Sequence, residues 1–400
     1  MERLYKDSGI EWIGRIPEEW EVDIAKHVFK QRHNKGNDEC QLLAATQKYG
    51  MYPQHLLEGV VKVAAETDLS QFKTVHKNDY VISLRSFQGG FEMSEYEGVC
   101  SPAYQVFYAT RDINNQYYKY VFKSDAFIQE INSLVIGIRE GKNILYDDFA
   151  LMYIPIPSYY DQQRIASYLD MKCGEIDVLI ALQEKMIAQL TEYKQAVITE
   201  AVTKGLDPNA KLVPSGIEWI GDVPEGWKVV QIKRYLSFQN GQDYKEIETS
   251  ENEGFPVYGS GGIFAYASQF MYAGESVLFG RKGTVNRPLY VNCKFWTVDT
   301  MYYTIPKEGA CCKFLYYVAT TLPYDKYSTS TALPSMTQTI LGNMKIAFPT
   351  ISEQESIASY LDTKCCEIDS LITLKRQKIE SLNAYKKSII YEAVTGKTII

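Results

Sequence analysis

Two glycine-containing loops carry the residue types best suited to chemistry in this 400-residue chain. They are SLRSFQGGF at Ser83–Phe91 and FGRKGTVN at Phe279–Asn286. Arginine and lysine donors match the guanine edge, glutamine matches adenine, and the glycines allow the backbone to come close to a groove or a phosphate. The loops therefore predict contacts with nucleic acid. The alternative is that both loops are ordinary solvated turns.

No catalytic or metal-binding pattern accompanies the loops. GRKGT lacks the spacing of a nucleotide phosphate loop, and GSGG at 259–262 is not a dinucleotide-binding turn. All four histidines precede residue 77, and the eight cysteines form no CxxC pair. A hydrolase would need a base that the second half does not offer. The sequence predicts a non-enzymatic binding protein without catalytic residues, metal or cofactor of its own.

The overall charge limits how this chain could bind nucleic acid. With 42 basic and 49 acidic residues, the formal net charge is −7. A protein that holds DNA alone needs a surplus of positive charge against the phosphates. A phosphate-binding surface must therefore be locally concentrated or supplied by a partner. The sequence has no leader and no apolar run of about 18 residues, so a cytoplasmic protein is expected.

An internal duplication organises the chain. SGIEWIGRIPEEW at Ser8–Trp20 returns as SGIEWIGDVPEGW at Ser215–Trp227, an offset of 207 residues. QQRIASYLDMKCGEIDVLI at 162–180 returns as EQESIASYLDTKCCEIDSLI at 353–372, with Ile165 matching Ile357 at an offset of 192 residues. The material between the two blocks differs between the copies, so the frame is duplicated and its contents have diverged.

Each copy of the second block predicts a long helix of about forty residues, or about 60 Å. Asp161 and Ser352 stand at candidate N-cap positions, and Gly205 and Gly396 mark the ends. The near-heptad apolar stripe predicts an antiparallel seam between the helices or an interface with another subunit. The residues expected there are Ile176, Leu179, Ile187 and Leu190 of the first helix, and Ile368, Leu371, Ile379 and Leu382 of the second.

Between the repeated blocks, short β-prone runs alternate with glycine- and asparagine-rich turns. The predicted fold class is mixed α/β, with two recognition domains joined by two long antiparallel coiled-coil helices in a pseudo-twofold duplication. The recognition domains are expected at residues 1–160 and 206–351, and the helices at 161–205 and 352–400. The duplicated tryptophans, Trp12, Trp20, Trp219 and Trp227, are expected to anchor each domain on a helix.

The duplicated opening and the repeated IASYLD…EID helix resemble the specificity subunit of type I restriction-modification systems over essentially the whole chain. RSFQGGFEMSEYEGVCSPAYQVF at 85–107 and GRKGTVNRPLYVNCKFWTVDTMYY at 280–303 are similar to two common types of target recognition domain. One stretch departs from the family pattern. STALPSMTQTIL at 330–341 has Ser335 and Met336 where the family has Asn-Ile.

The resemblance implies that each variable segment reads one half of a bipartite site in double-stranded DNA. It also implies two modification subunits that bring S-adenosylmethionine, and restriction subunits that use ATP and Mg²⁺, with no membrane involved. An alternative is a duplicated coiled-coil adaptor that binds protein or glycan. The candidate DNA-contacting residues are Arg85, Ser86, Gln88, Gly89, Gly90, Tyr104, Lys142, Tyr258, Arg281, Lys282, Gly283, Thr284 and Asn286.

Overall fold

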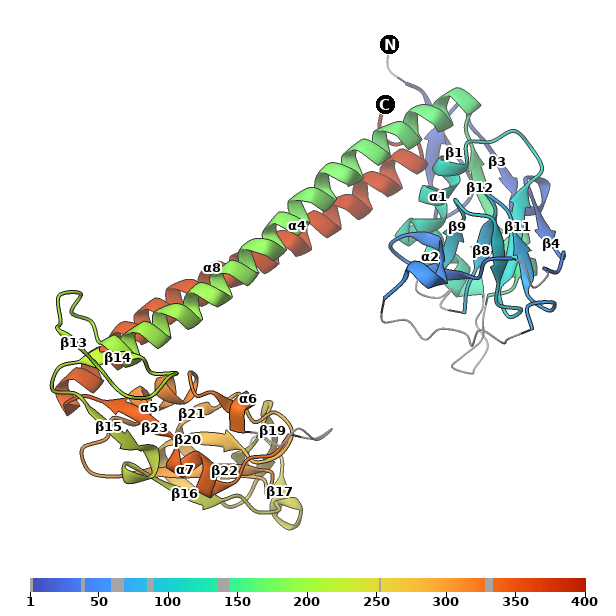
Figure 1. Cartoon of the computed structure of the whole chain (residues 1–400). Helices are drawn as coiled ribbons and strands as arrows, with labels where there is room; N and C mark the ends of the chain where they lie inside the picture. The colour runs from blue at the N-terminus through green and yellow to red at the C-terminus, as the bar shows by residue number, and fades with distance from the viewer. Residues whose placement is uncertain are drawn as a thin grey trace. The chain divides into compact units, whose positions relative to one another are not determined.

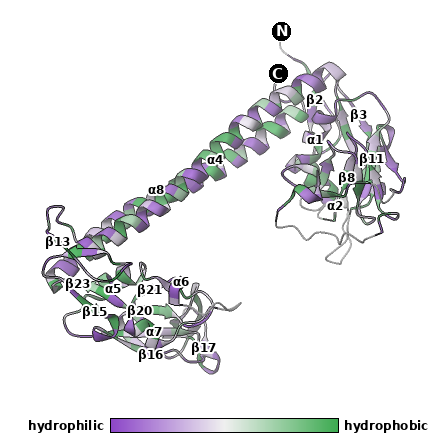
Figure 2. Cartoon of the chain, in the orientation of Figure 1, coloured by the Kyte–Doolittle hydropathy of each residue, from purple (hydrophilic) through white to green (hydrophobic). Residues whose placement is uncertain are grey.

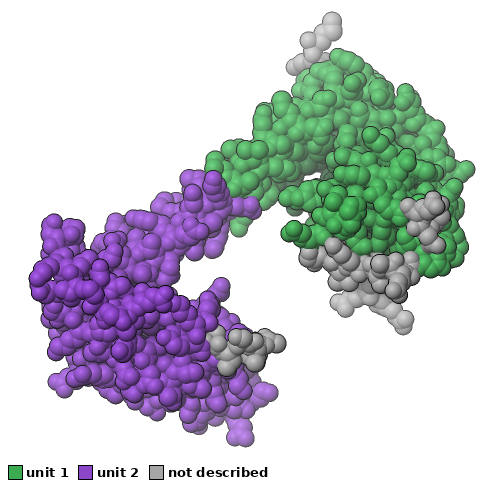
Figure 3. All heavy atoms as spheres, viewed as in Figure 1, with its two compact units in different colours: residues 1–183, 377–400 green, residues 184–376 purple. Residues whose placement is uncertain are grey.

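The chain divides into two compact units (Figure 3). Unit 1 comprises residues 1–183 and 377–400, and unit 2 comprises residues 184–376. This computed structural model describes residues 3–36, 40–58, 68–84, 90–134, 144–251, 253–327 and 334–400. The first unit is therefore assembled from both ends of the sequence, as the duplicated frame requires.

Each of the two long helices contributes one half to unit 1 and the other half to unit 2 (Figure 1). They are α4, Tyr159–Lys204, and α8, Ile351–Val394. In unit 1, Lys386 Nζ lies 2.6 Å from Asp177 Oδ1, and in unit 2, Lys194 Nζ lies 2.6 Å from Asp369 Oδ2. Asp177, early in α4, thus pairs with Lys386, late in α8, whereas the later Lys194 pairs with the earlier Asp369. The helices run in opposite directions, so the predicted antiparallel pairing is confirmed.

The ends of both helices are fixed by local interactions. Contrary to expectation, Asp161 and Ser352 lie inside the first turn. Instead, Ser158 Oγ accepts from the Asp161 amide at 3.1 Å, and the Thr350 amide donates to Glu353 Oε2 at 3.0 Å. At the other ends, the chain turns at Gly205 and Gly396, with φ of 76° and 71°. Cβ atoms there would lie 3.2 Å from the Trp227 ring and 3.0 Å from the Trp20 ring, so these two tryptophans anchor the helix ends as predicted.

Unit 1 is built around a four-stranded antiparallel sheet in the order β4-β11-β8-β9. Its core is aromatic: Phe29, Phe91, Phe107, Phe122 and Phe149 are all buried against one another. The elements are β1 (Tyr5–Asp7), β2 (Arg15–Pro17), β3 (Glu21–Ile24), η1 (Ala25–His27), β4 (Phe29–Arg32), β5 (Leu43–Thr46), β6 (Gly50–Pro53), η2 (Gln54–Leu56), β7 (Lys73–Val75), β8 (Tyr80–Ile82), β9 (Phe91–Met93), β10 (Gly98–Cys100), β11 (Gln105–Ala109), α1 (Asn115–Lys123), α2 (Asp125–Leu134), α3 (Tyr146–Ala150) and β12 (Tyr153–Ile156).

Unit 2 contains a seven-stranded sheet in the order β16-β22-β20-β21-β18-β19-β17. The pairing of β18 with β21 is parallel, and the other pairings are antiparallel. The elements are β13 (Leu212–Pro214), β14 (Asp222–Pro224), β15 (Lys228–Gln231), η4 (Ile232–Arg234), β16 (Leu236–Asn240), η5 (Lys245–Ile247), β17 (Glu248–Thr249), β18 (Phe255–Gly259), β19 (Gly262–Ala267), β20 (Tyr272–Gly280), β21 (Leu289–Thr297), β22 (Met301–Pro306), α5 (Cys312–Ala319), α6 (Tyr324–Tyr327), α7 (Gln338–Asn343) and β23 (Lys345–Phe348).

The same frame recurs in both units. The pair β3–β12 of unit 1 has its counterpart in β15–β23 of unit 2, and β4-β11-β8-β9 corresponds to β16-β22-β20-β21. Strands β17, β18 and β19 extend the sheet of unit 2, whereas unit 1 has the separate pairs β5–β6 and β7–β10. The predicted mixed α/β fold with a duplicated frame is confirmed. Polar and apolar residues alternate along α4 and α8 (Figure 2), and no described helix is long and apolar enough to cross a membrane.

A buried glutamine joins each sheet domain to its long helix. In unit 1, Gln162 accepts from the Asn114 amide at 2.8 Å and donates to the Pro157 carbonyl at 2.9 Å. In unit 2, Gln354 accepts from the Cys311 amide at 2.9 Å and donates to a proline carbonyl at 3.1 Å. Each side chain thus ties the start of a long helix to the start of a domain helix, α1 or α5.

Replacing Gln162 by leucine is expected to destabilise unit 1. The Asn114 amide and the Pro157 carbonyl would lose their partner in a buried place, and each unsatisfied group costs about 1–3 kcal/mol. Gln163→Leu is the matched control, because Gln163 is the exposed next residue. Denaturant unfolding of both variants measures the free energy of unfolding. Equal stability of the two variants would show that the glutamine does not hold the domain to the helix.

Candidate nucleic-acid interface

The loop after β20 in unit 2 is a tight, backbone-bonded turn. Gly280 is required at its start, because a Cβ there would lie 2.2 Å from the Thr284 carbonyl oxygen. Gly283 has φ of 81°, in the region that favours glycine, and its amide donates to the Pro334 carbonyl at 2.9 Å. The glycines therefore shape the loop, and the side chains between them project from a fixed backbone.

Arg281 is held in place on this loop. Its amide donates to the Thr300 carbonyl at 2.8 Å, and its carbonyl accepts from the Met336 amide at 3.0 Å. The guanidinium lies 5.9 Å from the centre of the Tyr302 ring and 3.4 Å from the Asp299 carbonyl oxygen. No described carboxylate pairs with it. The guanidinium is thus positioned yet still has donors for a base or a phosphate.

Other predicted residues of this loop are accessible. Lys282, Thr284 and Asn286 are exposed, and Lys282 is bridged through its backbone to Ser335. The structure therefore brings Arg281, Lys282, Gly283, Thr284 and Asn286 together on one loop. In the described part of the departing stretch, residues 334–341, Met336 is buried and Ser335 forms a backbone bridge with Lys282.

The corresponding loop of unit 1 follows β8, the strand equivalent to β20. Arg85, Ser86, Gln88, Gly89 and Lys142 lie outside the described residues. Gly90 is buried, and its carbonyl accepts from the Ser83 amide at 2.8 Å. The prediction that the two loops occupy comparable places is confirmed, since each connects the same two strands of the shared sheet order.

The two predicted tyrosines are partly engaged in packing. Tyr104 packs against the small core that includes Leu43 and Val106, and its carbonyl accepts from Lys73. Tyr258 packs edge-on against Phe295, with ring centres 6.1 Å apart. Burial raises the pKa of Tyr258 to about 12, so its hydroxyl stays neutral at physiological pH. Each tyrosine therefore has a structural role whether or not it reaches DNA.

A basic groove in unit 2 was not found from the sequence. It lies where η4, β16 and α7 meet and has a volume of about 910 Å³. Lys233, Arg234 and Lys307 line it, together with hydroxyl and amide side chains, and no described lining residue is acidic. The available sequence signal was the basic pair Lys233-Arg234, which lies one residue after β15. The other residues that line the groove come from distant parts of the sequence.

Comparison with known proteins decides the family. The family of the type I restriction modification DNA specificity domain matches residues 17–192 and 224–384. The chain belongs to this family. It is a type I restriction-modification specificity subunit with two specificity domains.

Relatives and solved structures agree with the assignment. The chain is 23% identical to the type I restriction enzyme MjaVIII specificity subunit of Methanocaldococcus jannaschii, over 96% of this chain and 94% of that protein. It is 24% identical to the putative MjaX specificity subunit of the same organism, over 99% and 98%. A chain from a structure on complex assembly and conformational transition of the type I R-M system shares the fold with a TM-score of 0.76, 16% identity and coverage of 96% and 99%. The HsdS subunit from Thermoanaerobacter tengcongensis has a TM-score of 0.54, 16% identity and coverage of 96% and 98%.

The predicted seam residues of the specificity subunit fall into three groups. Ile176, Ile368 and Leu382 are buried, and Ile176 and Leu382 share the core of unit 1. Ile187, Leu190 and Ile379 are partly exposed. Leu179 and Leu371 were expected at the seam, but they are 45% and 46% exposed. The isoleucine four positions after the buried one takes the inward place instead: Ile372 is buried, and Ile180 packs against the core of unit 1.

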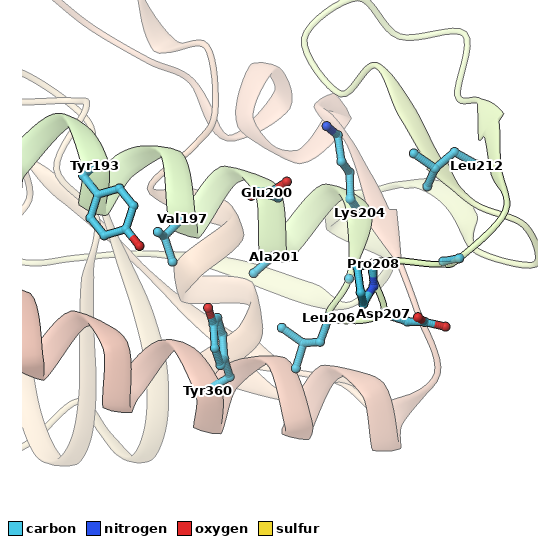
Figure 4. Close-up of a pocket in the computed structure, with 12 residues that line it drawn as sticks. Tyr193, Val197, Glu200, Ala201, Lys204, Leu206, Asp207, Pro208, Leu212 and Tyr360 are labelled. Atoms are coloured by element: carbon cyan, nitrogen blue, oxygen red, sulfur yellow. The ribbon is translucent and has the colours of Figure 1, made fainter.

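A second hollow of the specificity subunit has a different chemistry. It lies in unit 2 between the end of α4, the facing part of α8 and the connector after Gly205, with a volume of about 710 Å³. Tyr193 and Tyr360 point into the space between the helices, and Leu206 lies beside Tyr360 (Figure 4). Glu200 and Asp207 also line it. Exposed aromatic and apolar groups with carboxylates suit a protein partner better than a polyanion.

Proposed function

We propose that this specificity subunit reads a bipartite site in double-stranded DNA, one half with each unit. The observation that carries the proposal is the pair of glycine loops, each placed after the same strand of a shared frame but carrying different residues. Because the two loops connect equivalent strands of a common frame, their different side chains would read different bases. Arg281 and Lys282 would contact the half-site of unit 2, and Arg85 and Gln88 the other half-site.

The proposed partners supply the chemistry that the chain lacks. Two modification subunits would bring S-adenosylmethionine and methylate adenine, and restriction subunits would use ATP and Mg²⁺. The formal charge of −7 supports this division, because partner subunits would add the remaining phosphate contacts. Binding of the assembled methylase to duplexes that carry the methylated motif tests the proposal. An assembled complex that holds every duplex equally would contradict it.

The surface proposed for the modification subunits is duplicated and apolar. In unit 1 it consists of Leu179 and Leu182 on α4 with Tyr385 on α8, and in unit 2 of Leu371 and Leu374 on α8 with Tyr193 on α4. These six side chains are between 45% and 59% exposed. The Asp177–Lys386 ion pair lies beside the first set in the sequence, and the equivalent Lys194–Asp369 pair lies beside the second. Two copies of one surface fit two copies of one partner.

Single charged substitutions on this surface are expected to change the stoichiometry of the complex. Leu179→Asp should leave one modification subunit bound, Leu371→Asp should leave the other, and the double variant should bind none, because an aspartate in an apolar interface is desolvated without a partner. Met171→Asp is the control, since Met171 is 53% exposed and its counterpart is a threonine. Light scattering of the purified complexes gives the mass. Two bound subunits in the double variant would rule out this surface.

A further inference from the structure

We propose that the basic groove of unit 2 holds a DNA phosphate strand beside the bases read by the Arg281 loop, and that unit 1 has no equivalent grip. This inference rests on the proposed function and adds a second contact site to it. The groove is open, and Lys233, Arg234 and Lys307 are all exposed. A cationic hollow with neutral donors suits a phosphodiester.

Contacts among the lining residues fix the shape of the groove. The Lys307 ammonium donates to the Lys233 carbonyl at 2.9 Å, and the Lys233 ammonium donates to Asn343 Oδ1 at 2.6 Å. Gly342 allows α7 to pack on η4, because a Cβ at that position would lie 3.1 Å from Lys233 Cβ. Both ammonium groups therefore have neutral partners, and no described carboxylate forms an ion pair with either. Arg234 makes no hydrogen bond or ion pair with a described residue, so its donors face solvent.

Neutral polar side chains complete the lining. Gln231, Ser237, Gln338, Thr339 and Asn343 all line the groove. Amide and hydroxyl donors commonly bind phosphate oxygens next to lysine and arginine. The hollow beside Tyr193 is lined by two carboxylates and one lysine, so it lacks the positive surplus of the groove.

The chain links the groove to the Arg281 loop. Residues 334–336 bond that loop through Gly283 and Arg281, and the next segment begins α7. Gln338, the first residue of α7, lines the groove and donates to Asn240 Oδ1 at 3.0 Å. The six residues of α7 span about 9 Å at 1.5 Å each. Gln338 and Asn343, at the two ends of this helix, both line the groove, so the groove runs along α7 from the end nearest the loop.

The same place in unit 1 is neutralised by acids. Lys26 and His27 of η1 occupy the positions of Lys233 and Arg234 in the duplicated frame. His27 Nδ1 lies 2.7 Å from Asp23 Oδ1, and Arg111 lies 3.3 Å from the same carboxylate. The helix equivalent to α7, α3, carries two aspartates in its first turn. Unit 1 therefore does not repeat the cationic surface.

The test uses the specificity subunit assembled with its modification subunits. Arg234→Gln, Lys307→Gln and the Lys233→Gln, Arg234→Gln, Lys307→Gln triple variant are compared with the wild type on matched and mismatched duplexes between 50 and 200 mM salt. Each lost phosphate contact should reduce the slope of log affinity against log salt by about 0.9. Raising the salt from 50 to 200 mM lowers the affinity, and each lost contact should make this salt-induced loss about 3.5-fold smaller. The change should be equal on the matched and the mismatched duplex. Lys26→Gln should leave the slope unchanged.

The outcomes distinguish a failure of the groove proposal from a failure of the proposed function. A triple variant with the wild-type slope, in a complex that still prefers its motif, would overturn the groove alone. A complex that shows no preference for any duplex would contradict the proposed function, and with it the proposed role of the groove. An equal slope change in Lys26→Gln would overturn the asymmetry between the units. If the triple variant folds poorly, Arg234→Gln decides, because that side chain has no described partner to lose.

Discussion

Exchanging residues 21–157 for the equivalent segment of another specificity subunit is expected to change one half of the methylated sequence completely and to leave the other half unchanged. Each unit has its own sheet and its own buried core, so the segment can be replaced without disturbing the core of unit 2. The frame strands β3 and β12 pair at the two ends of the segment. The exchange therefore replaces both frame strands together with the recognition surface and leaves the long helices unchanged.

The reciprocal exchange of residues 229–349 is the matched control. It should change the other half of the motif and keep the first. Methylation of exchanged complexes on a library of duplexes measures both halves at once. If either exchange altered both half-sites, the units would not read DNA independently.

Arg281→Ala is expected to weaken specific binding by the assembled methylase about ten- to a hundredfold. A bidentate contact with a base is worth about 1–3 kcal/mol of discrimination, and each 1.4 kcal/mol is a factor of ten. The side chain is already held by the Asp299 carbonyl and the Tyr302 ring, so little ordering is needed on binding. The substitution removes this contact without opening a buried cavity, because Arg281 is partly exposed.

The comparison of duplexes distinguishes the kinds of contact. A base contact predicts a loss confined to duplexes that carry the correct half-site of unit 2. If Arg281 touched only phosphate, the loss would be similar on every duplex, and the salt slope would fall by about one. Lys282→Ala is a useful companion, since this exposed neighbour shares the loop backbone. Unchanged affinity for every duplex would make the loop an ordinary solvated turn.

The frame was predictable because its signals are local and occur twice. The spacing of apolar residues on the long helices, the glycines at their ends and the repeated tryptophans each follow from short stretches of sequence. The antiparallel pairing also followed from the duplication. The N-caps were misplaced by three and two residues, because Ser158 and Thr350 precede Asp161 and Ser352, which the pattern favoured.

The rest depends on contacts between distant residues. Leu179 and Leu371 match the apolar spacing, yet their exposure depends on how the two helices are rotated about their axes. The basic groove joins residues around 233, 307 and 338–343, which no short pattern links. Gln162 and Gln354 were included in the repeat, but their role as buried ties appears only when the helix and the domain are placed together.

Sequencing of methylated adenines in a host that expresses this specificity subunit with its modification subunits tests the central claim most directly. The proposal predicts a single motif of two short specific sequences separated by a non-specific spacer, with methylated adenine in each half. Arg281→Ala should relax only one of the two halves. A single uninterrupted motif, or no methylation when both subunits are assembled, would contradict the account.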